Sequence, residues 1–262
     1  MRVDVVTIFP GMVEPVLAQS LLGKARERGL IDVQVHDLRR WADPPHRQVD
    51  DYAYGGGPGM LMKPEPIVRA VEELRTEASW TVLLSPQAQP LTQPAVRRLA
   101  ERQHLILVCG RYEGVDDRVR DLVIDEEISI GDYIVAGGEV PALVLIEATS
   151  RLIPGVVGCG DSVRDESHAA GLLEYPQYTR PEEFRGRRVP ATLLSGDHGR
   201  VADWRRAHAL RRTLDRRPDL LSEPDLTEAQ RRLLAEFDSG GQDDTSEQPP
   251  RPSSGRDDEA SA

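Results

Sequence analysis

The feature that most constrains this chain is a pair of short apolar runs, each of which ends at a glycine. Residues 105–109 stop at Gly110, and residues 128–130 stop at Gly131. Short apolar runs that end at turn residues and precede helical sequence predict buried strands of a parallel α/β sheet. Ligands of such sheets bind outside the carboxyl ends of the strands, so the two glycine turns are candidate ligand-binding loops.

The two turns and the sequence after them contain five glycines, at positions 110, 114, 131, 137 and 138. Glycine adopts positive φ angles and lets the backbone approach a ligand closely. The spacing is neither Gly-x-Gly-x-x-Gly nor that of a P-loop, so neither a dinucleotide nor a triphosphate is indicated. Each glycine alone fits an ordinary turn between a strand and a helix. Together they favour a site, because five polar or aromatic residues stand among them: Arg111, Tyr112, Glu113, Asp132 and Tyr133.

The composition is that of a globular protein, with 39% hydrophobic and 29% charged residues among 262. This length allows one large domain or two small ones. No apolar run approaches the roughly 18 residues of a membrane span, and the strand-like start predicts no signal peptide. Two cysteines, Cys109 and Cys159, make neither a disulfide framework nor a zinc quartet, so we expect the reducing cytoplasm. Cys109 lies in an apolar run and is expected to be a core residue.

The net charge of −11 argues at first against a nucleic-acid partner, but the charge is unevenly distributed. Residues 238–262 carry seven acids and two arginines, whereas residues 180–217 carry eleven arginines and five acids. An acidic average therefore leaves room for a basic face that phosphates would meet. The alternative is that the arginine-rich segment is an ordinary solvated helix surface.

The rest of the first 157 residues predicts one α/β domain. Strands are expected at residues 2–9, 31–38 and 80–84, and helices at residues 12–28, 64–77, 94–102, 114–122 and 139–152. Acidic residues 125–127 are expected to connect the helix at 114–122 to the strand at 128–130. Residues 39–62 form a long polar loop, which in a compact domain is functional or disordered. The fold class is therefore a parallel sheet with helices on both faces, and periodicity alone favours a Rossmann-like strand order.

Shifts in composition divide the chain into four segments. Residues 1–157 are the α/β domain, and residues 158–174 are a flexible interdomain linker rich in glycine and charge. Residues 175–238 form a small, mainly helical domain, with a helix over the arginine-rich residues 200–217 and a capping box at residues 227–230. Residues 239–262 contain almost no apolar side chains and are expected to be a disordered acidic tail.

Several long motifs, in order, resemble one known family. Residues 109–116 (CGRYEGVD) and 129–139 (SIGDYIVAGGE) are similar to those of the bacterial tRNA (guanine-N1)-methyltransferases, the TrmD family of the SPOUT class. The similarity spans about residues 1–237 and continues through residues 54–60, 151–155, 171–181 and 193–198. It implies a deep trefoil knot in residues 1–157. Knots are so rare among protein folds that the sequence pattern alone would not predict one. It also implies S-adenosylmethionine as the methyl donor, with Mg²⁺ as a second candidate cofactor.

The resemblance further implies what the protein acts on and how it assembles. The expected reaction is methylation of guanine N1 at tRNA position 37, next to the anticodon. Residues 175–238 would bind tRNA. The family forms homodimers in which each active site is shared across the interface. The cofactor-binding residues implied by the matched motifs are Ser85, Pro86, Gly110, Tyr112, Glu113, Ile130, Gly131, Asp132, Tyr133, Ile134, Val135, Gly137 and Gly138.

The catalytic residues implied by the resemblance are Glu166, Asp165 and Arg151. Guanine N1 carries a proton that a general base must remove. The family uses a linker aspartate followed by Ser-Phe, but here Glu166 occupies that position, with Ser167 and His168 after it. Either Glu166 acts as the base, which we favour, or a register shift brings in Asp165. Without the resemblance, both would be read as solvated linker acids.

Arg151 would face guanine O6, where an arginine stabilises developing negative charge. Its simpler interpretation is a cation at the carboxyl end of a helix, favoured by the helix dipole. Two other functions remain open at this point. One is a knotted RNA methyltransferase that acts on a ribose 2′-oxygen, and the other is a non-catalytic RNA-binding protein that keeps the fold.

Overall fold

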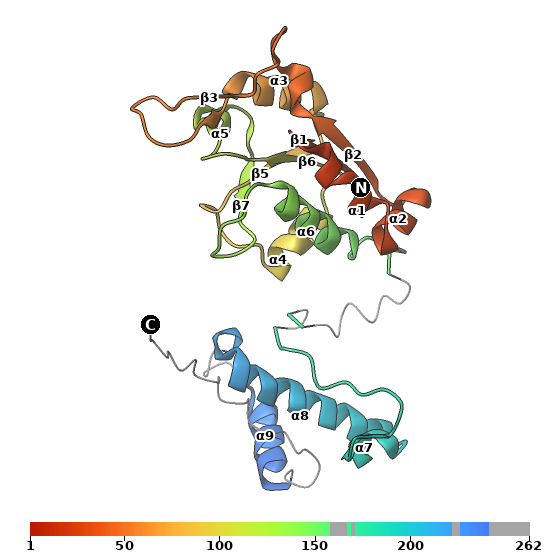
Figure 1. Ribbon diagram of the computed structural model, residues 1–262. Helices are drawn as coiled ribbons and strands as arrows, with labels where there is room; N and C mark the ends of the chain where they lie inside the picture. Colours follow the sequence, from red (N-terminus) through yellow and green to blue (C-terminus); the bar gives the residue numbers. More distant parts are fainter. Residues whose placement is uncertain (158–166, 169–170, 222–225, 241–262) are drawn as a thin grey trace, which may run out of the picture. The chain divides into compact units, whose positions relative to one another are not determined.

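The computed structural model describes residues 1–157, 167–168, 171–221 and 226–240, which fall into two compact units divided after residue 163 (Figure 1). The first unit contains one five-stranded sheet in which every neighbouring pair is parallel. Its spatial order is β2-β1-β6-β5-β7. The strands are β1 (Arg2–Thr7), β2 (Asp32–Asp37), β5 (Ser79–Leu84), β6 (His104–Cys109) and β7 (Glu126–Ile128).

Helices cover both faces of this sheet, as the sequence predicts. One face carries α1 (Glu14–Leu17), α2 (Ser20–Glu27), α4 (Gln93–Ala100) and α6 (Glu139–Ser150). The other face carries the 3-10 helix η2 (Leu38–Trp41), α3 (Pro64–Leu74) and α5 (Arg118–Val123). Alternate residues of β6 enter the two cores, with Leu105 and Leu107 on one side and Ile106 and Val108 on the other.

The Rossmann-like strand order is wrong, because β6 lies between β1 and β5. Burial explains this arrangement. All six residues of β6 are buried, which suits a strand with neighbours on both sides. One of the two sheet edges is β7, which is three residues long and carries Glu126 and Glu127. Short, charged strands are the ones that tolerate a sheet edge.

The boundary of β7 also differs from the prediction, since the strand includes acids that were expected to form a connector. Glu126 accepts two hydrogen bonds from Arg98, at 2.8 and 2.5 Å, and one from the Trp80 indole at 2.9 Å. Glu127 accepts a hydrogen bond from Arg120 at 2.9 Å. Because these partners neutralise both carboxylates, the acidic segment can pair as a strand.

The single helix expected over residues 12–28 is instead a 3-10 turn, η1 (Pro10–Met12), and two short helices, α1 and α2. The helical run is interrupted between α1 and α2, where Ser20 has a φ of 53°, outside the helical region. Leu17 and Leu22 explain the break. They are five positions apart and would diverge on one continuous helix, yet both are buried in the same core.

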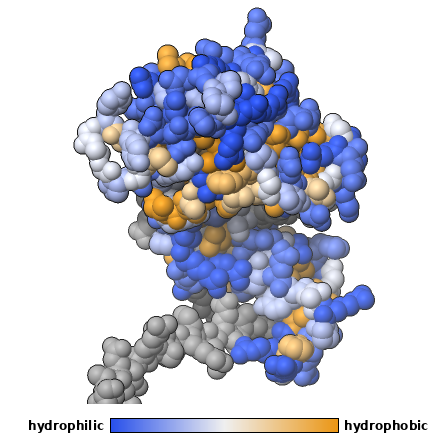
Figure 2. All heavy atoms as spheres, turned by 45° about the horizontal axis from the view of Figure 1, so that its top comes forward, coloured by the Kyte–Doolittle hydropathy of each residue, from blue (hydrophilic) through white to orange (hydrophobic). Residues whose placement is uncertain are grey.

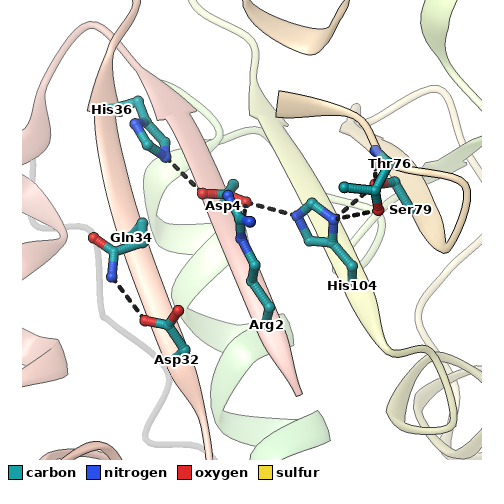
Figure 3. A network of polar contacts seen from close by, with 8 residues as sticks. All are labelled: Arg2, Asp4, Asp32, Gln34, His36, Thr76, Ser79 and His104. Carbon is teal, nitrogen blue, oxygen red and sulfur yellow. Dashed lines mark hydrogen bonds and ion pairs between the residues drawn. The ribbon is translucent and has the colours of Figure 1, made fainter. Parts of the chain in front are cut away.

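Asp4, in the middle of β1, is a fully buried acid that was not singled out in the sequence. Its oxygens lie 2.7 Å from Nε2 of His36, 2.6 Å from Nε2 of His104 and 2.8 Å from Nε of Arg2 (Figure 3). The two histidines come from β2 and β6, so the carboxylate joins three adjacent strands.

The long polar segment at residues 39–62 is ordered at both ends. It begins in η2 and contains a two-stranded antiparallel pair, β3 (Asp50–Asp51) with β4 (Leu61–Met62). Met62 N–H donates to the carbonyl of Gly114 at 2.9 Å, and Asp116 N–H donates to the carbonyl of Met62 at 3.0 Å. These bonds fasten the segment to the loop after β6.

The described part of the second unit is mainly helical. It contains α7 (Ala191–Leu194), α8 (His198–Arg216) and α9 (Glu228–Gly240), a short 3-10 turn η3 (Pro218–Leu220), and the small hairpin of β8 (Glu183–Phe184) and β9 (Arg187–Arg188). The predicted capping box is present, since Thr227 and Gln230 exchange backbone-to-side-chain hydrogen bonds of 2.8 and 3.2 Å. None of the helices in the described ranges has the length and apolar character of a membrane span.

Candidate functional site

A cavity of about 270 Å³ lies at the carboxyl edge of the sheet, where β5, β6 and β7 end. Its wall is built from the three loops that follow these strands, with Pro141 of α6 closing one side. Sheets of this kind bind ligands at this edge. The structure therefore brings the two glycine turns and the loop after residue 84 into one site.

Backbone hydrogen bonds hold the three loops together. Ser85 N–H donates to the carbonyl of Ile128 at 3.0 Å, and Leu91 N–H donates to the carbonyl of Ser129 at 2.7 Å. Gly138 N–H donates to the carbonyl of Gly110 at 2.9 Å. Since each loop is tied to another by main-chain bonds, the cavity is largely preformed.

Most of the residues predicted to bind the cofactor line this cavity, although their role in binding stays a prediction. Gly131 and Asp132 do not line it. Gly131 has a φ of 143° and turns the chain, while the Tyr133 hydroxyl donates to the carbonyl of Ile130 at 3.2 Å. The predicted residues that do line it are Ser85, Pro86, Gly110, Tyr112, Glu113, Ile130, Tyr133, Ile134, Val135, Gly137 and Gly138.

Gly137 and Gly138 are needed for close approach rather than for an unusual φ angle. A Cβ atom on Gly138 would lie 2.6 Å from Cα of Cys109 and 3.0 Å from the backbone nitrogen of Gly110. A Cβ atom on Gly137 would overlap the guanidinium of Arg111. The start of α6 can therefore pack directly on the end of β6 because Gly138 lacks a side chain, and Gly137 leaves room for the Arg111 guanidinium.

Tyr112 and Tyr133 are not core side chains, since their exposed fractions are 46% and 56%. Tyr112 also has a φ of 58°, a left-handed conformation that residues with a Cβ atom seldom adopt. Partial burial, together with the nearby carboxylate of Asp50, raises the pKa of the Tyr112 phenol. Strained residues of this kind concentrate at functional sites.

Glu113 connects the cavity with the glycine-rich part of the long loop. Its N–H donates to the carbonyl of Met60 at 3.0 Å. A Cβ atom on Gly59 would lie 2.5 Å from both Cγ and Oε1 of Glu113, so the side chain rests directly on that glycine. Glu113 thus brings a carboxylate and the segment at residues 55–59 to the same edge of the sheet.

The catalytic candidates are not brought together in the described residues. Glu166 and Asp165 lie outside the described ranges. Arg151 directly follows α6, is half-buried, and donates its N–H to the carbonyl of Glu147 at 3.3 Å, but it does not line the cavity. Within the described ranges, no group of three or more His, Cys, Asp or Glu side chains is arranged to hold a metal ion, and Mg²⁺ stays a prediction.

Among the residues at the cavity that sequence reasoning missed, Arg120 and Pro141 line it. Glu139 is fully buried and hydrogen-bonded to Arg111, which also lines it. Arg120 gave no signal, because it sits on a short helix among other charges. Glu139 offered one, because this acid ends the matched motif at residues 129–139, directly after two glycines.

Cys109 is buried, as its place in an apolar run predicts. Burial raises the pKa of its thiol well above the usual value, and the nearby carboxylate of Glu139 raises it further. A thiol held in its protonated form is a poor nucleophile. Cys109 is therefore part of the core and not of the chemistry.

A parallel sheet with a loop-walled cavity at the carboxyl ends of its strands is the arrangement typical of ligand-binding α/β proteins. Comparison with known proteins narrows this class. A family model described as tRNA (guanine-1)-methyltransferase TrmD matches residues 1–223. The chain belongs to this family, and the resemblance seen in its motifs is confirmed.

Curated relatives match this chain over nearly their whole length. A tRNA (guanine-N(1)-)-methyltransferase from Dictyoglomus turgidum is 51% identical over 237 residues, which cover 90% of this chain and 96% of the relative. One from Geobacillus kaustophilus is 50% identical, covering 91% and 98%. One from Frankia alni is 52% identical, covering 89% and 90%.

Proposed function

We propose that this protein transfers a methyl group from S-adenosylmethionine to N1 of guanine at tRNA position 37. The observation that carries the proposal is the loop-walled cavity at the ends of β5, β6 and β7, in a chain of the TrmD family. Because the substrate is tRNA, we also propose that the protein works in the cytoplasm.

The residues around the cavity suit S-adenosylmethionine. Ile130, Val135 and Pro141 offer apolar surface to a purine ring, and the carboxylate of Glu113 offers negative charge to a cationic ligand. The volume of about 270 Å³ is close to the lower end of ordinary ligand pockets, roughly 300 Å³. When bound, the cofactor supplies an electrophilic methyl group on a sulfonium.

The proposed chemistry needs one base and one cation from the chain. As the bond from guanine N1 to the methyl carbon forms and the bond from that carbon to sulfur breaks, the N1 proton passes to a carboxylate. We assign this role to Glu166, with Asp165 as the alternative, and we assign Arg151 to guanine O6. The remaining contribution of the protein is to orient the two substrates and exclude water.

The second unit is the proposed tRNA-binding domain, comprising residues 175–238 after a linker at 158–174. The helix α8 carries arginines over much of its length, and the segment at residues 180–217 has a net charge of +6 from eleven arginines and five acids. Arginines on such a surface bind phosphates and set the position of an RNA without reading its sequence. A guanine in a single-stranded loop can then be splayed into the methyl-transfer site.

We further propose a homodimer in which a second copy completes each active site. Apolar areas reach the surface of the first unit between hydrophilic ones (Figure 2). Five exposed apolar side chains lie on η1, on the residue before it, on α1 and on α6, and they are Phe9, Met12, Val16, Val140 and Val144. Exposed apolar surface shared by neighbouring elements is typical of an interface.

The trefoil knot of the family is also part of the proposal. Three features support it: β6 lies between β1 and β5, β7 pairs on the far side of β5, and the loops after these strands are bonded to each other. Loops that pass one another at the strand ends would give the three walls of the cavity.

The proposed function is tested by offering labelled S-adenosylmethionine and two tRNA transcripts, with guanine or adenine at position 37. Label only on the guanine transcript is the expected result. Equal label on both transcripts would move the target elsewhere and favour a different RNA methyltransferase. Cofactor binding without label on either transcript would favour a non-catalytic RNA-binding protein.

A further inference from the structure

Glu139, the first residue of α6, is fully buried and has no part in the chemistry proposed above. Removing a carboxylate from water is costly unless it is paired and hydrogen-bonded. The partners of Glu139 therefore show what the carboxylate holds in place.

Its two oxygens are bound from two different elements. Oε2 accepts a hydrogen bond from Nε of Arg111 at 2.8 Å, and Oε1 accepts one from the Thr7 hydroxyl at 2.5 Å. The Thr7 oxygen in turn accepts the N–H of Phe9 at 2.9 Å. The carboxylate thus joins the end of β1, the loop after β6 and the start of α6.

The Arg111 side chain carries this connection to the cavity wall. Its Nη1 donates to the carbonyl of Ala136 at 3.3 Å, its Nη2 lies 2.9 Å from Sδ of Met12, and its guanidinium lies 4.6 Å from the centre of the Phe9 ring. A Cβ atom on Gly137 would overlap this guanidinium, so the loop before α6 rests on it. With only 14% of its side chain exposed, Arg111 is a support for the loop.

We infer that Glu139 is a positioning residue for cofactor binding. By fixing Arg111, it holds the turn at residues 136–138 against Gly110, and these two stretches form one wall of the cavity. The inference rests on the proposed function, because it takes the cavity to be the S-adenosylmethionine site. Loss of the carboxylate loosens that wall while leaving the tRNA-binding unit unchanged.

The test uses the full chain with Glu139→Gln, which keeps the side-chain shape, and a pair at the other oxygen, Thr7→Val and Thr7→Ser. Valine removes the hydroxyl and serine keeps it. Glu72→Gln is the matched control, because Glu72 is an exposed acid of α3 on the opposite face of the sheet. The dissociation constant for S-adenosylmethionine is measured by calorimetry, the KM for each substrate and kcat by methyl transfer, and folding by circular dichroism.

With Glu139→Gln, the dissociation constant and the KM for S-adenosylmethionine should rise about 10-fold, as expected for the loss of one charge-assisted hydrogen bond. The KM for tRNA and the kcat at saturating cofactor should stay near their wild-type values. Thr7→Val should also weaken cofactor binding, Thr7→Ser should restore it, and Glu72→Gln should bind as the wild type does.

Unchanged cofactor affinity in a folded Glu139→Gln variant would overturn the inference, and so would equal increases in both KM values, which would indicate general loosening. If Glu139→Gln does not fold, the Thr7 pair decides, and equal affinity of the valine and serine variants would overturn it. A wild-type protein that fails to bind S-adenosylmethionine would instead overturn the proposed function itself, and this inference with it.

Discussion

His104 and Asp4 are one hundred positions apart in the chain, yet Nε2 of the histidine lies 2.6 Å from Oδ2 of the aspartate in the interior of the first unit (Figure 3). On its other side, Nδ1 of His104 lies 2.7 Å from the Ser79 hydroxyl, which itself accepts the N–H of Thr76 at 2.7 Å. Both ring nitrogens of His104 are thus within hydrogen-bond distance of a polar partner. This chain of bonds ties the three central strands β1, β6 and β5 together.

The Asp4 cluster predicts a specific dependence of stability on pH. Burial alone would raise the pKa of the Asp4 carboxyl, but hydrogen bonds from His36, Arg2 and His104 outweigh it, and the pKa lies below its usual value. The stability that this group contributes is therefore complete above the unfolded-state pKa of about 3.9 and is lost as the pH falls through the lower folded-state pKa.

Asp4→Asn should lower the free energy of unfolding at pH 7 by about 2 kcal/mol or more, because a buried charge-assisted network loses its anion. The variant should also lose less stability than the wild type between pH 5 and pH 3. This range extends roughly one unit on either side of the ordinary aspartate pKa. Urea unfolding at a series of pH values measures both effects. Parallel curves for the two proteins would contradict the assignment.

Gly138→Ala should damage both stability and cofactor binding. The added methyl group meets main-chain atoms of Cys109 and Gly110, which cannot rotate away, so the start of α6 must shift. Overpacking of this kind costs about 1–3 kcal/mol. Gly11→Ala is the control, because a methyl group there meets no atom within 4 Å. Thermal unfolding and calorimetry check the prediction, and equal behaviour of the two variants would show that the wall at Gly138 can yield.

The arrangement of elements could be predicted from the sequence where one local signal dominated. β1 and β2 alternate between apolar and polar residues, β5 and β6 are apolar runs, and the structure places all four strands within one or two residues of the prediction. The break at Ser20 and the extension of β7 to Glu126 could not be predicted. Both depend on contacts with distant elements, namely the core below α1 and α2 and the arginines of α4 and α5.

The motif residues indicated which loops form the cavity. They did not indicate which contacts hold those loops in place. The two glycine turns pointed to the loops after β6 and β7, and the resemblance to the family added Ser85 and Pro86 of the loop after β5. The Thr7–Glu139 bond joins residues 132 positions apart, and no local pattern announces such a contact. Glu139 is structurally important because its carboxylate joins the end of β1 to the loop after β6.

Two substitutions at Tyr112 separate the backbone strain from the function of the ring. Tyr112→Gly and Tyr112→Ala both remove the ring, but only alanine must still adopt the left-handed conformation. The glycine variant should therefore be more stable than the alanine variant by about 1 kcal/mol. If the ring packs on the cofactor, both variants should lose affinity for S-adenosylmethionine equally. Chemical unfolding measures the stability, and calorimetry measures the affinity for S-adenosylmethionine. Weaker cofactor binding in the alanine variant alone would assign the effect to the loop conformation.

The proposed dimer can be tested on α6. Val144→Asp places a charge on an exposed apolar position of that helix, 42% exposed in a single chain, and should give monomers that no longer transfer methyl groups. Leu122→Asp, on α5 with 62% exposure, introduces the same charge outside the proposed interface and should leave the dimer intact. Sedimentation velocity distinguishes the two outcomes. A dimeric Val144→Asp protein would remove α6 from the interface.

The identity of the general base follows from a comparison of Glu166→Gln with Asp165→Asn. If Glu166 removes the guanine N1 proton, its amide variant should lower kcat by about 100-fold or more, within the usual contribution of a general base. Binding of S-adenosylmethionine should not change, because we assign it to the described residues that line the cavity. Asp165→Asn should keep most of the activity and the wild-type dependence of kcat on pH.

The opposite pattern would transfer the role to Asp165 through a one-residue shift of the linker. Full activity in both variants would show that neither linker acid takes the proton. The target would then be a group that needs no such base at this position, and the ribose 2′-oxygen would become the better assignment. Product analysis by nucleoside mass spectrometry separates these cases, since 1-methylguanosine and 2′-O-methylguanosine carry the added methyl on the base and on the sugar.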